Sequence, residues 1–315
     1  MPTSSIAPPA IPTTVKLIQQ LQAHLGQTIV GKEKPIELLL TAFLAGGHVL
    51  LEDVPGVGKT VLAKSLAKAI KGKYQRIQCT PDLLPTDLTG TNIWNPNSRE
   101  FEFLAGPIFT NILLADEINR ATPRTQSALL EVMAEQQVTV DGQTRPIDRP
   151  FFVIATQNPV EYQGTFPLPE AQMDRFMVCL SLGYPTADEE LRMLQGIATR
   201  EASQQSSTCL TLEQLTALTK QCRAVYVESS VQQYMVNLVQ ATRQHSDVSL
   251  GVSPRGTIAL YQAAQAHALI KGRDYTIPDD VKLLVPYVFT HRIVTSNSTR
   301  SSQIVDRLLQ EVAIP

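Results

Sequence analysis

The chain has 315 residues, enough for one large domain or two ordinary ones, and 43% of them are hydrophobic, enough to build a full core. Its formal net charge of −2 gives no electrostatic reason to expect binding to nucleic acid or to an anionic membrane. No apolar run reaches membrane-spanning length, and we expect no secretion signal, because no basic region followed by an apolar one is present at the start.

The cysteines and histidines argue against a disulfide framework and a zinc site. The four cysteines include no Cys-x-x-Cys pair, and we expect them to be reduced packing residues of a cytoplasmic protein. The five histidines include no His-x-x-x-His pair, so the sequence does not predict a zinc site.

The first segments predict a leader followed by two helices. Residues 1–14 are rich in Pro, Ser and Thr, and we expect them to be disordered. Apolar residues at helical spacing predict a helix over residues 15–27. A second helix is predicted over residues 33–45, because Pro35 suits its first turn and two glycines follow its end.

A phosphate-binding loop is predicted between a buried strand at residues 49–51 and a helix over residues 61–70. This order of strand, loop and helix is the context that a P loop requires. Gly56 and Gly58 let the backbone approach a ligand closely because they carry no Cβ. The backbone N–H groups of the loop and the positive end of the next helix can then surround an anion.

The residues at the end of this loop specify a nucleotide. Lys59 would reach the outer phosphates of ATP, and the Thr60 hydroxyl would hold Mg²⁺. The general pattern begins with Gly, whereas this chain has Asp53 there, a residue that tolerates unusual backbone angles. The alternative is a surface turn with a solvated lysine, but the flanking strand and helix favour a nucleotide site.

The next segment predicts a hairpin. Residues 74–79 are predicted to form a second strand, and residues 81–90 a helical segment that Pro85 interrupts. Residues 91–107 place turn residues between two short extended runs, which is typical of a hairpin inserted into or beside the helix. This hairpin carries three aromatic residues, Trp94, Phe101 and Phe103. They could touch a substrate, or equally pack beneath the hairpin.

The remaining strands complete a predicted α/β domain over residues 15–182. Alternating residues around Asp141 and Gly142 predict a second hairpin. The later strands are nearly all apolar, as expected for a parallel sheet covered by helices on both faces. The predicted elements are a strand at residues 111–117, a helix at 122–135, the hairpin at 137–145 and strands at 151–155 and 177–180.

From residue 183 the pattern changes, and residues 183–315 predict a separate all-helical domain. Ser253 suits the N-cap of one helix, with Pro254 at its first position. The predicted helices cover residues 187–203, 212–221, 229–245, 254–271, 278–289 and 302–312.

Two acidic residues at the end of an apolar strand are the second chemical signal. Asp116 would hold Mg²⁺ through water, opposite Thr60. Glu117 would orient or deprotonate the attacking water. Paired acids at a strand end also serve as helix caps, but a preceding P loop favours the catalytic interpretation.

Three further polar residues could complete the site. Asn158 ends the fourth strand beside these acids and could position water, although Asn-Pro also favours a turn. Arg175 could project into a neighbouring subunit as an arginine finger, or pair with Asp174 or Glu170. Arg255 opens a helix of the second domain, where it could touch the phosphates across the domain junction or remain exposed.

Together these residues resemble the AAA+ ATPases, and within them the MoxR family. The resemblance covers nearly the whole chain after the leader, and it makes the Asp at position 53 a family feature. It is carried by residues 51–60, 106–109, 114–121, 155–159, 168–176 and 253–255.

The resemblance implies a role for each candidate. Residues 91–107 would be the helix-2 insert and residues 137–149 the pre-sensor hairpin. Asp116 and Glu117 would be the Walker B acids, Asn158 sensor 1, Arg175 the arginine finger and Arg255 sensor 2. The catalytic set would be Lys59, Glu117, Asn158, Arg175 and Arg255, and the metal ligands would be Thr60 and Asp116. The nucleotide-binding set would be Val30 and Gly31 at the adenine, and Asp53, Val54, Pro55, Gly56, Val57, Gly58, Lys59, Thr60 and Val61 at the phosphates.

We therefore expect an ATP hydrolase with a five-stranded parallel sheet and a helical lid, and with ATP at their junction. Arg175 acting in trans would make the active form a ring, expected to be a hexamer. The resemblance implies a chaperone-like remodeller with a protein client and a partner that contains a von Willebrand factor A domain. Two rivals are a nucleotide-gated binding scaffold and a DNA-acting motor, and the acidic balance weighs against the motor.

Overall fold

A computed structural model of the protein describes residues 11–158, 164–200, 209–296 and 298–315. Most of the predicted leader lies outside these residues. Its last four residues belong to helix α1 (Ile11–Thr28), which begins earlier than the sequence predicts. The reason is tertiary, because Thr14 is buried and its hydroxyl donates to Gln221 Oε1 at 2.6 Å.

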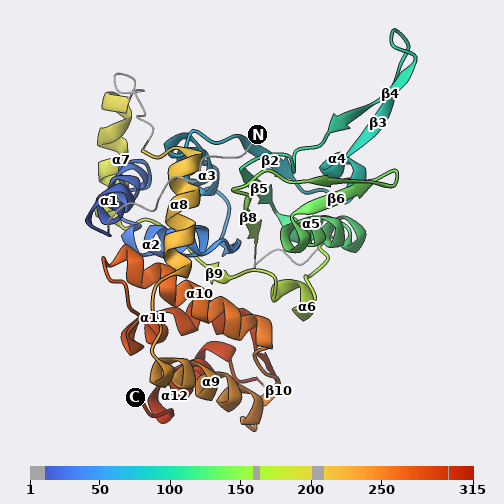
Figure 1. Ribbon diagram of the computed structural model, residues 1–315. Coiled ribbons are helices and arrows are strands. Elements are labelled where there is room, and N and C mark those ends of the chain that lie inside the picture. The colour runs from blue at the N-terminus through green and yellow to red at the C-terminus, as the bar shows by residue number, and fades with distance from the viewer. Residues whose placement is uncertain (1–10, 159–163, 201–208, 297) are drawn as a thin grey trace.

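A five-stranded parallel sheet forms the centre of the α/β domain (Figure 1), which confirms the predicted architecture. Its strand order is β2-β5-β8-β1-β9, so β1 lies between β8 and β9. The strands are β1 (Val49–Glu52), β2 (Tyr74–Gln78), β5 (Ile112–Asp116), β8 (Phe152–Gln157) and β9 (Val178–Leu180). Because all five are parallel, the loops that follow them meet at one edge of the sheet.

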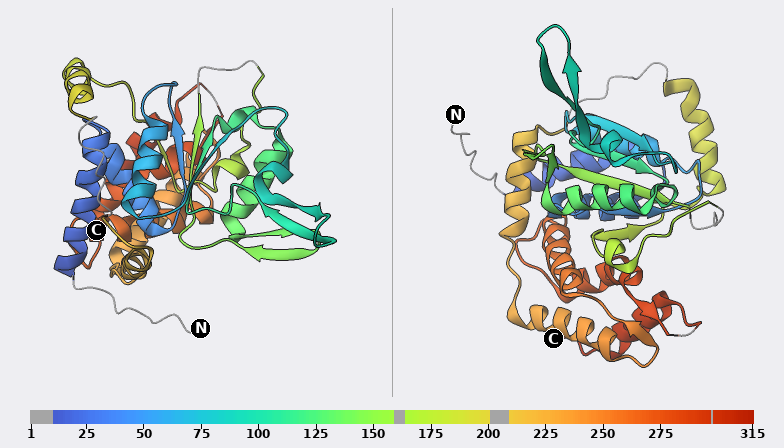
Figure 2. Two further views of the ribbon diagram at one scale, coloured as in Figure 1. Left: turned by 90° about the horizontal axis from the view of Figure 1, so that it is seen from above. Right: turned by 90° about the vertical axis from the view of Figure 1, so that its right-hand side faces the viewer.

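Helices cover both faces of this sheet (Figure 2). Alternation along β5 shows the two layers, since Ile112 and Leu114 belong to one hydrophobic core and Leu113 and Ala115 to the other. The helical elements of this domain are α1, α2 (Glu33–Ala45), α3 (Lys59–Ala69), α4 (Pro85–Thr89), η1 (Ile118–Arg120), α5 (Pro123–Glu135) and α6 (Glu170–Met173).

The segment around Pro85 differs from its prediction. Pro85 does not interrupt a helix but is the first residue of the short helix α4, a position where a missing N–H costs nothing. Both predicted hairpins are present. The first pairs β3 (Gly90–Asn95) with β4 (Glu100–Ala105), and the second pairs β6 (Gln137–Val140) with β7 (Gln143–Pro146).

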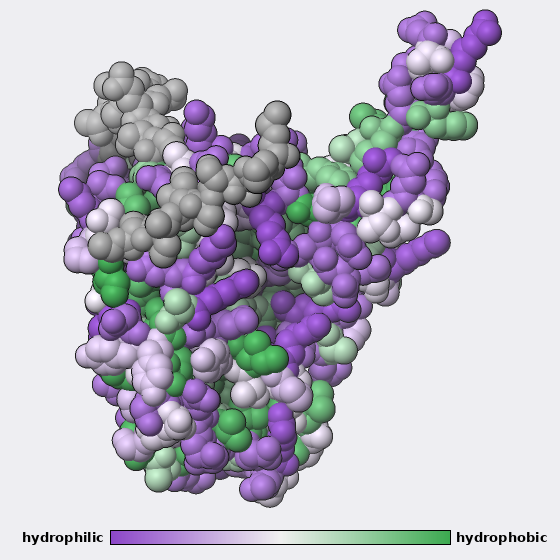
Figure 3. Space-filling view, viewed as in Figure 1, coloured by the Kyte–Doolittle hydropathy of each residue, from purple (hydrophilic) through white to green (hydrophobic). Residues whose placement is uncertain are grey.

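The β3–β4 hairpin projects from the body of the molecule (Figures 1 and 2) and carries apolar residues on its surface (Figure 3). Trp94 and Phe101 face each other across the strands, with ring centroids 5.3 Å apart, and are 54% and 70% exposed. Phe103 packs instead against Phe109 and lies 3.9 Å from the guanidinium carbon of Arg145. The structure therefore separates the three aromatics into one packing residue and an exposed pair.

The C-terminal part contains a helical lid, as predicted, and its helices beyond residue 228 lie below the sheet in Figure 1. It also contains a short antiparallel pair that we did not predict, because its strands are too brief to show alternation. The elements that follow β9 are α7 (Ala187–Arg200), α8 (Leu212–Arg223), α9 (Ser229–Gln244), β10 (Val248–Leu250), α10 (Pro254–Ile270), α11 (Pro278–Phe289), η2 (Thr290–Arg292), β11 (Val294–Thr295) and α12 (Ser301–Glu311). The predicted extension of α7 to residue 203 lies outside the described residues.

The lid and the α/β domain share a hydrophobic core. Helix α2 packs against both α8 and α10, and one continuous core joins Leu39 of α2 with Leu218 of α8 and Leu260 of α10. The domain boundary between residues 182 and 183 stays a prediction. No helix in the described parts of the chain is long and apolar enough to cross a membrane.

A charge network also joins the lid to α2. His267 of α10 lies 2.6 Å from Asp280 Oδ1 and 3.0 Å from Glu37 Oε1. Burial lowers the pKa of His267, but the bonds to both carboxylates outweigh this effect and raise it overall. The hydrogen bond from His267 lowers the pKa of Glu37 to about 2. Burial raises the pKa of Asp280, but the hydrogen bonds from Arg273 and His267 outweigh it and bring that pKa to about 2.

We expect His267→Gln to reduce the free energy of unfolding by about 1–3 kcal/mol near pH 5.5, because charge-assisted hydrogen bonds are lost. The raised pKa of His267 gives a stabilisation that is complete below about pH 6.5 and disappears as the pH rises through the folded value. The lowered pKa values of the carboxylates give a stabilisation that is complete above about pH 4.5 and is lost as the pH falls towards about 2.

Chemical denaturation from pH 5 to 9 measures this effect as the difference in unfolding free energy between the wild type and His267→Gln. The difference should shrink as the pH rises. The same measurement on His245→Gln, in the turn after α9, is the control for a His-to-Gln change outside this network. A constant difference across the range would contradict a charged His267.

Candidate phosphate-binding site and arginine pocket

The P loop and the acids line one pocket of about 340 Å³ at the carboxyl edge of the sheet. The structure thus brings together most of the predicted site. The lining residues are Pro55, Gly56, Gly58, Lys59, Thr60, Val61, Arg76, Gln78, Asp116, Glu117 and Asn158.

The loop has the backbone geometry that its glycines predict. Gly56 and Gly58 have φ values of +88° and +98°, in the left-handed region that favours glycine. Helix α3 begins at Lys59, directly after Gly58, so its amino end adjoins the pocket. The ammonium group of Lys59 is buried and donates to the carbonyl oxygen of Asp53 at 3.0 Å. A lysine held beside free helical N–H groups makes a preformed anion site.

The Asp53 side chain does not line this pocket. It is 4% exposed and accepts hydrogen bonds from Ser181 Oγ at 2.7 Å, Leu182 N at 2.6 Å and Gly183 N at 3.0 Å. Asp53 therefore ties the start of the P loop to the end of β9 and the beginning of the lid. Val54 and Val57, which we also expected at the nucleotide, are not among the lining residues either.

The two acids are held by residues of the neighbouring strands. Asp116 accepts from the Thr156 hydroxyl at Oδ1 and from Arg76 Nη2 at Oδ2, both at 2.7 Å. Glu117 has a φ of +56°, and its backbone N–H donates to Thr156 Oγ1 at 2.9 Å. Gln78 Nε2 donates to Glu117 Oε2 at 3.0 Å. These bonds fix both carboxylates beside Lys59 and Thr60.

Sequence reasoning missed Arg76, Gln78 and Thr156. Arg76 and Gln78 alternate on β2, which is paired with β5 in a register that sets Gln78 opposite Asp116. Two polar residues on one face of a short strand next to the acids were the available signal. Thr156 stands within the predicted fourth strand, but its fully buried hydroxyl becomes informative only once β8 is placed beside β5.

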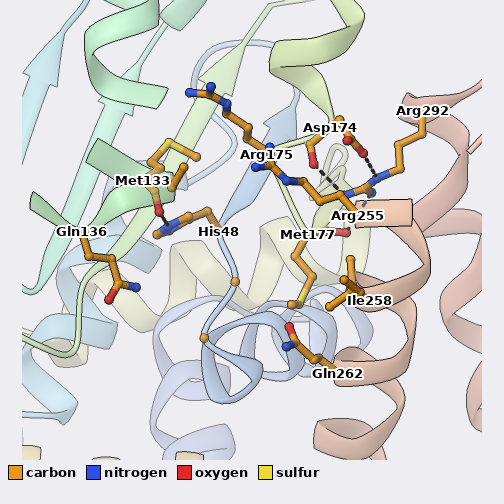
Figure 4. A pocket seen from close by; sticks show the side chains of 14 residues that line it. His48, Met133, Gln136, Asp174, Arg175, Met177, Arg255, Ile258, Gln262 and Arg292 are labelled. Carbon is orange, nitrogen blue, oxygen red and sulfur yellow. Dashed lines mark hydrogen bonds and ion pairs between the residues drawn. The ribbon is translucent and has the colours of Figure 1, made fainter. Parts of the chain in front are cut away.

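Arg175 and Arg255 line a different pocket, of about 280 Å³, between the α/β domain and the lid (Figure 4). Gly47 and His48, which precede β1, also line it, so it lies at the amino edge of the sheet. The four residues of β1 separate this edge from the P loop by about 10–13 Å. The structure therefore does not bring Arg255 to the phosphate pocket of its own chain, where we expected it.

A clamp of two hydrogen bonds on Asp174, one of which Figure 4 shows, joins the chain segments that carry the two arginines. Asp174 Oδ1 accepts from Arg292 Nε at 2.8 Å, and Oδ2 accepts from Ser253 Oγ at 2.7 Å. Burial lowers the pKa of Arg292, although the charge of Asp174 opposes this shift. Ser253 also caps α10 through a bond from Gly256 N. Arg175 adjoins Asp174, and Arg255 lies in the first turn of α10, so both depend on this clamp.

Val30 and Gly31 lie in the turn between α1 and α2, next to the P loop. A Cβ at Gly58 would come within 3.3 Å of Ile29 Cδ1, which shows how closely this turn packs on the loop. Gly31 has a φ of +77°, and a Cβ there would lie 1.8 Å from Glu189 Oε1. The adenine-binding role of this turn stays a prediction.

Comparison with known proteins defines the class. Residues 48–178 match the model of the ATPase family associated with various cellular activities, and residues 240–312 match the AAA lid domain. Together with the five-stranded parallel sheet, the P loop and the helical lid, these matches identify an AAA+ ATPase.

The relatives define the family. The chain is 49% identical to YeaC of Bacillus subtilis, over 95% of both chains, and 42% identical to Chaperone MoxR1 of Mycobacterium tuberculosis, over 91% of this chain and 79% of that one. A Cytophaga hutchinsonii crystal structure described as a "putative ATPase" superposes with a TM-score of 0.90 at 37% identity, over 97% of both chains. The chain belongs to the MoxR family of AAA+ ATPases.

Proposed function

We propose that this protein hydrolyses Mg-ATP in a ring and uses the energy to remodel a protein client. The P loop and the amino end of α3 would bind the phosphates, and Lys59 would turn from Asp53 to the outer phosphates. Glu117 would orient and deprotonate the attacking water, with Asn158 beside it.

The residues present fit magnesium. Thr60 and Asp116 line the same pocket as Lys59, and Mg²⁺ in nucleotide sites is held by one or two oxygen side chains together with phosphates and water. The bound metal would neutralise charge on the phosphates. The Thr156 hydroxyl orients the Asp116 carboxylate for this task.

The separation of the two pockets is the observation that supports the proposed ring. Arg175 and Arg255 lie at the amino edge of the sheet, while the P loop lies at the carboxyl edge of the same sheet. One chain therefore does not assemble its own full set of cations. A head-to-tail ring would unite the arginine pocket of one copy with the P loop of the next. This arrangement extends the trans role from Arg175 to Arg255.

The finer parts of the proposal rest on the family. A protein client fits the relative named Chaperone MoxR1. The exposed Trp94 and Phe101 pair on the projecting hairpin is our candidate contact for that client. The hexameric ring, a partner with a von Willebrand factor A domain and a cytoplasmic location stay predictions.

The test uses the purified chain, with phosphate release and light scattering recorded with and without Mg-ATP. We expect the wild type to hydrolyse ATP and to form a closed oligomer. Lys59→Ala should weaken ATP binding about 100-fold or more, because Lys59 is the buried cation of the phosphate pocket. Lys71→Ala, an exposed lysine beyond α3, is the control. A chain that remains a single copy and releases no phosphate would contradict the proposal.

A further inference from the structure

The contact between Arg76 and Asp116 has no place in the function proposed above. Arg76 lies on β2, the edge strand of the sheet, and its Nη2 lies 2.7 Å from Asp116 Oδ2 and 2.9 Å from Gln78 Oε1. Both Arg76 and Asp116 line the pocket that contains the P loop. A cation of the protein thus binds the carboxylate that we expect to hold a metal.

The two oxygens of Asp116 have different partners. Oδ1 accepts from Thr156, a fully buried residue of the next strand, and this bond sets the orientation of the carboxylate. Oδ2 accepts from Arg76, whose side chain is 46% exposed whereas that of Asp116 is 13% exposed. The first partner is fixed by the fold, while the second can turn into solvent because nothing in the sheet lies beyond β2.

A structural role explains this pair poorly. An ion pair with so exposed a cation adds little to folding stability, because solvent screens it and a long side chain must be ordered. Its effect on the pocket is direct. A guanidinium at Oδ2 brings a positive charge to the place where a divalent cation would need the same carboxylate, and like charges repel.

We propose that Arg76 is a latch on the metal site. It holds Asp116 while no metal is bound, and it must release Asp116 before this carboxylate can hold Mg²⁺. Arg76 is thus a positioning residue that sets the Mg²⁺ concentration at which nucleotide becomes firmly bound. This inference rests on the proposed use of Mg-ATP.

The test measures binding, without turnover. A fluorescent ADP derivative is bound to the full-length protein, and Mg²⁺ is titrated to find the concentration that gives half of the metal-dependent change. We expect Arg76→Gln to lower this concentration about fivefold, the scale of an exposed ion pair. Arg76→Lys keeps the charge without the fork of N–H groups, so its half-maximal Mg²⁺ concentration should lie between those of the wild type and Arg76→Gln. Arg307→Gln on α12 is exposed, changes the net charge equally and should match the wild type.

The outcomes separate the latch from the function on which it rests. If the wild type binds the ADP derivative with no response to Mg²⁺, the proposed metal site fails. If the wild type responds and Arg76→Gln needs the same or more Mg²⁺, the metal site stands and the latch is wrong. Circular dichroism and thermal unfolding without nucleotide check that Arg76→Gln is folded, and Arg76→Lys repeats the comparison in a second variant.

Discussion

Glu117→Gln is expected to bind ATP nearly as well as the wild type and to hydrolyse it at least about 100-fold more slowly. The amide keeps the size of the side chain and can still accept the hydrogen bond that Gln78 donates. It cannot take a proton from water, so the chemical step should be lost. The amide also loses the ion pair with Arg120 at 3.2 Å, but this pair is partly exposed and contributes little. Single-turnover phosphate release and equilibrium ATP binding, measured on the same preparation, check both parts.

The matched control is Glu131→Gln, an exposed residue of α5. It removes the same charge away from the pocket and should leave turnover unchanged. Unchanged turnover in Glu117→Gln would remove this residue from the mechanism. Loss of ATP binding in Glu117→Gln would show instead that Glu117 contributes to binding ATP.

Arg175→Ala and Lys59→Ala should each abolish ATP hydrolysis alone and regain part of it when mixed. An arginine finger typically contributes a factor of about a thousand or more to turnover. In a mixed ring, a subunit with an intact Lys59 can adjoin one with an intact Arg175. With random assembly, about a quarter of the interfaces unite both residues, so activity should recover to about that share of the wild type.

The control for this experiment mixes Lys59→Ala with Glu117→Gln. Both residues line the same pocket of one chain, so no arrangement of these subunits restores a complete site. No recovery is expected. Arg255→Ala should behave like Arg175→Ala, because both arginines line the second pocket. If Arg175→Ala gains nothing in rings whose mixed composition is verified, its action in trans is excluded.

The sequence predicts four of the five strands well because they are buried on both faces of the sheet. The runs at β1, β5, β8 and β9 are mostly apolar, as expected for parallel strands that helices cover on both faces. Helix ends are predicted less well where a distant contact decides them. Helix α1 begins early because Thr14 is buried and bonds to Gln221 of another helix. The β10–β11 pair lies where β10 packs against α9, and neither strand has a local signature in the sequence.

The sequence predicts the chemistry of the P loop because the residues of this loop are neighbours in the chain. Lys59, Thr60, Asp116 and Glu117 lie where the motifs predict them, in one pocket. The contact of Arg76 with Asp116 depends on the register between β2 and β5, which cannot be predicted from the sequence. The position of Arg255 depends on how the lid packs, and only the folded structure shows that it shares a pocket with Arg175.

The clamp on Asp174 has a mechanical consequence for a ring. Because Arg292 and Ser253 grip the same carboxylate, a pull on the segment that bears Arg175 is passed directly to η2 and to the amino end of α10. In the proposed ring, phosphate release at the P loop of one protomer would therefore move α10 and η2 of the adjoining protomer together. Successive ATP hydrolysis events in neighbouring subunits would then be coupled by rigid-body movement, without any loop having to refold.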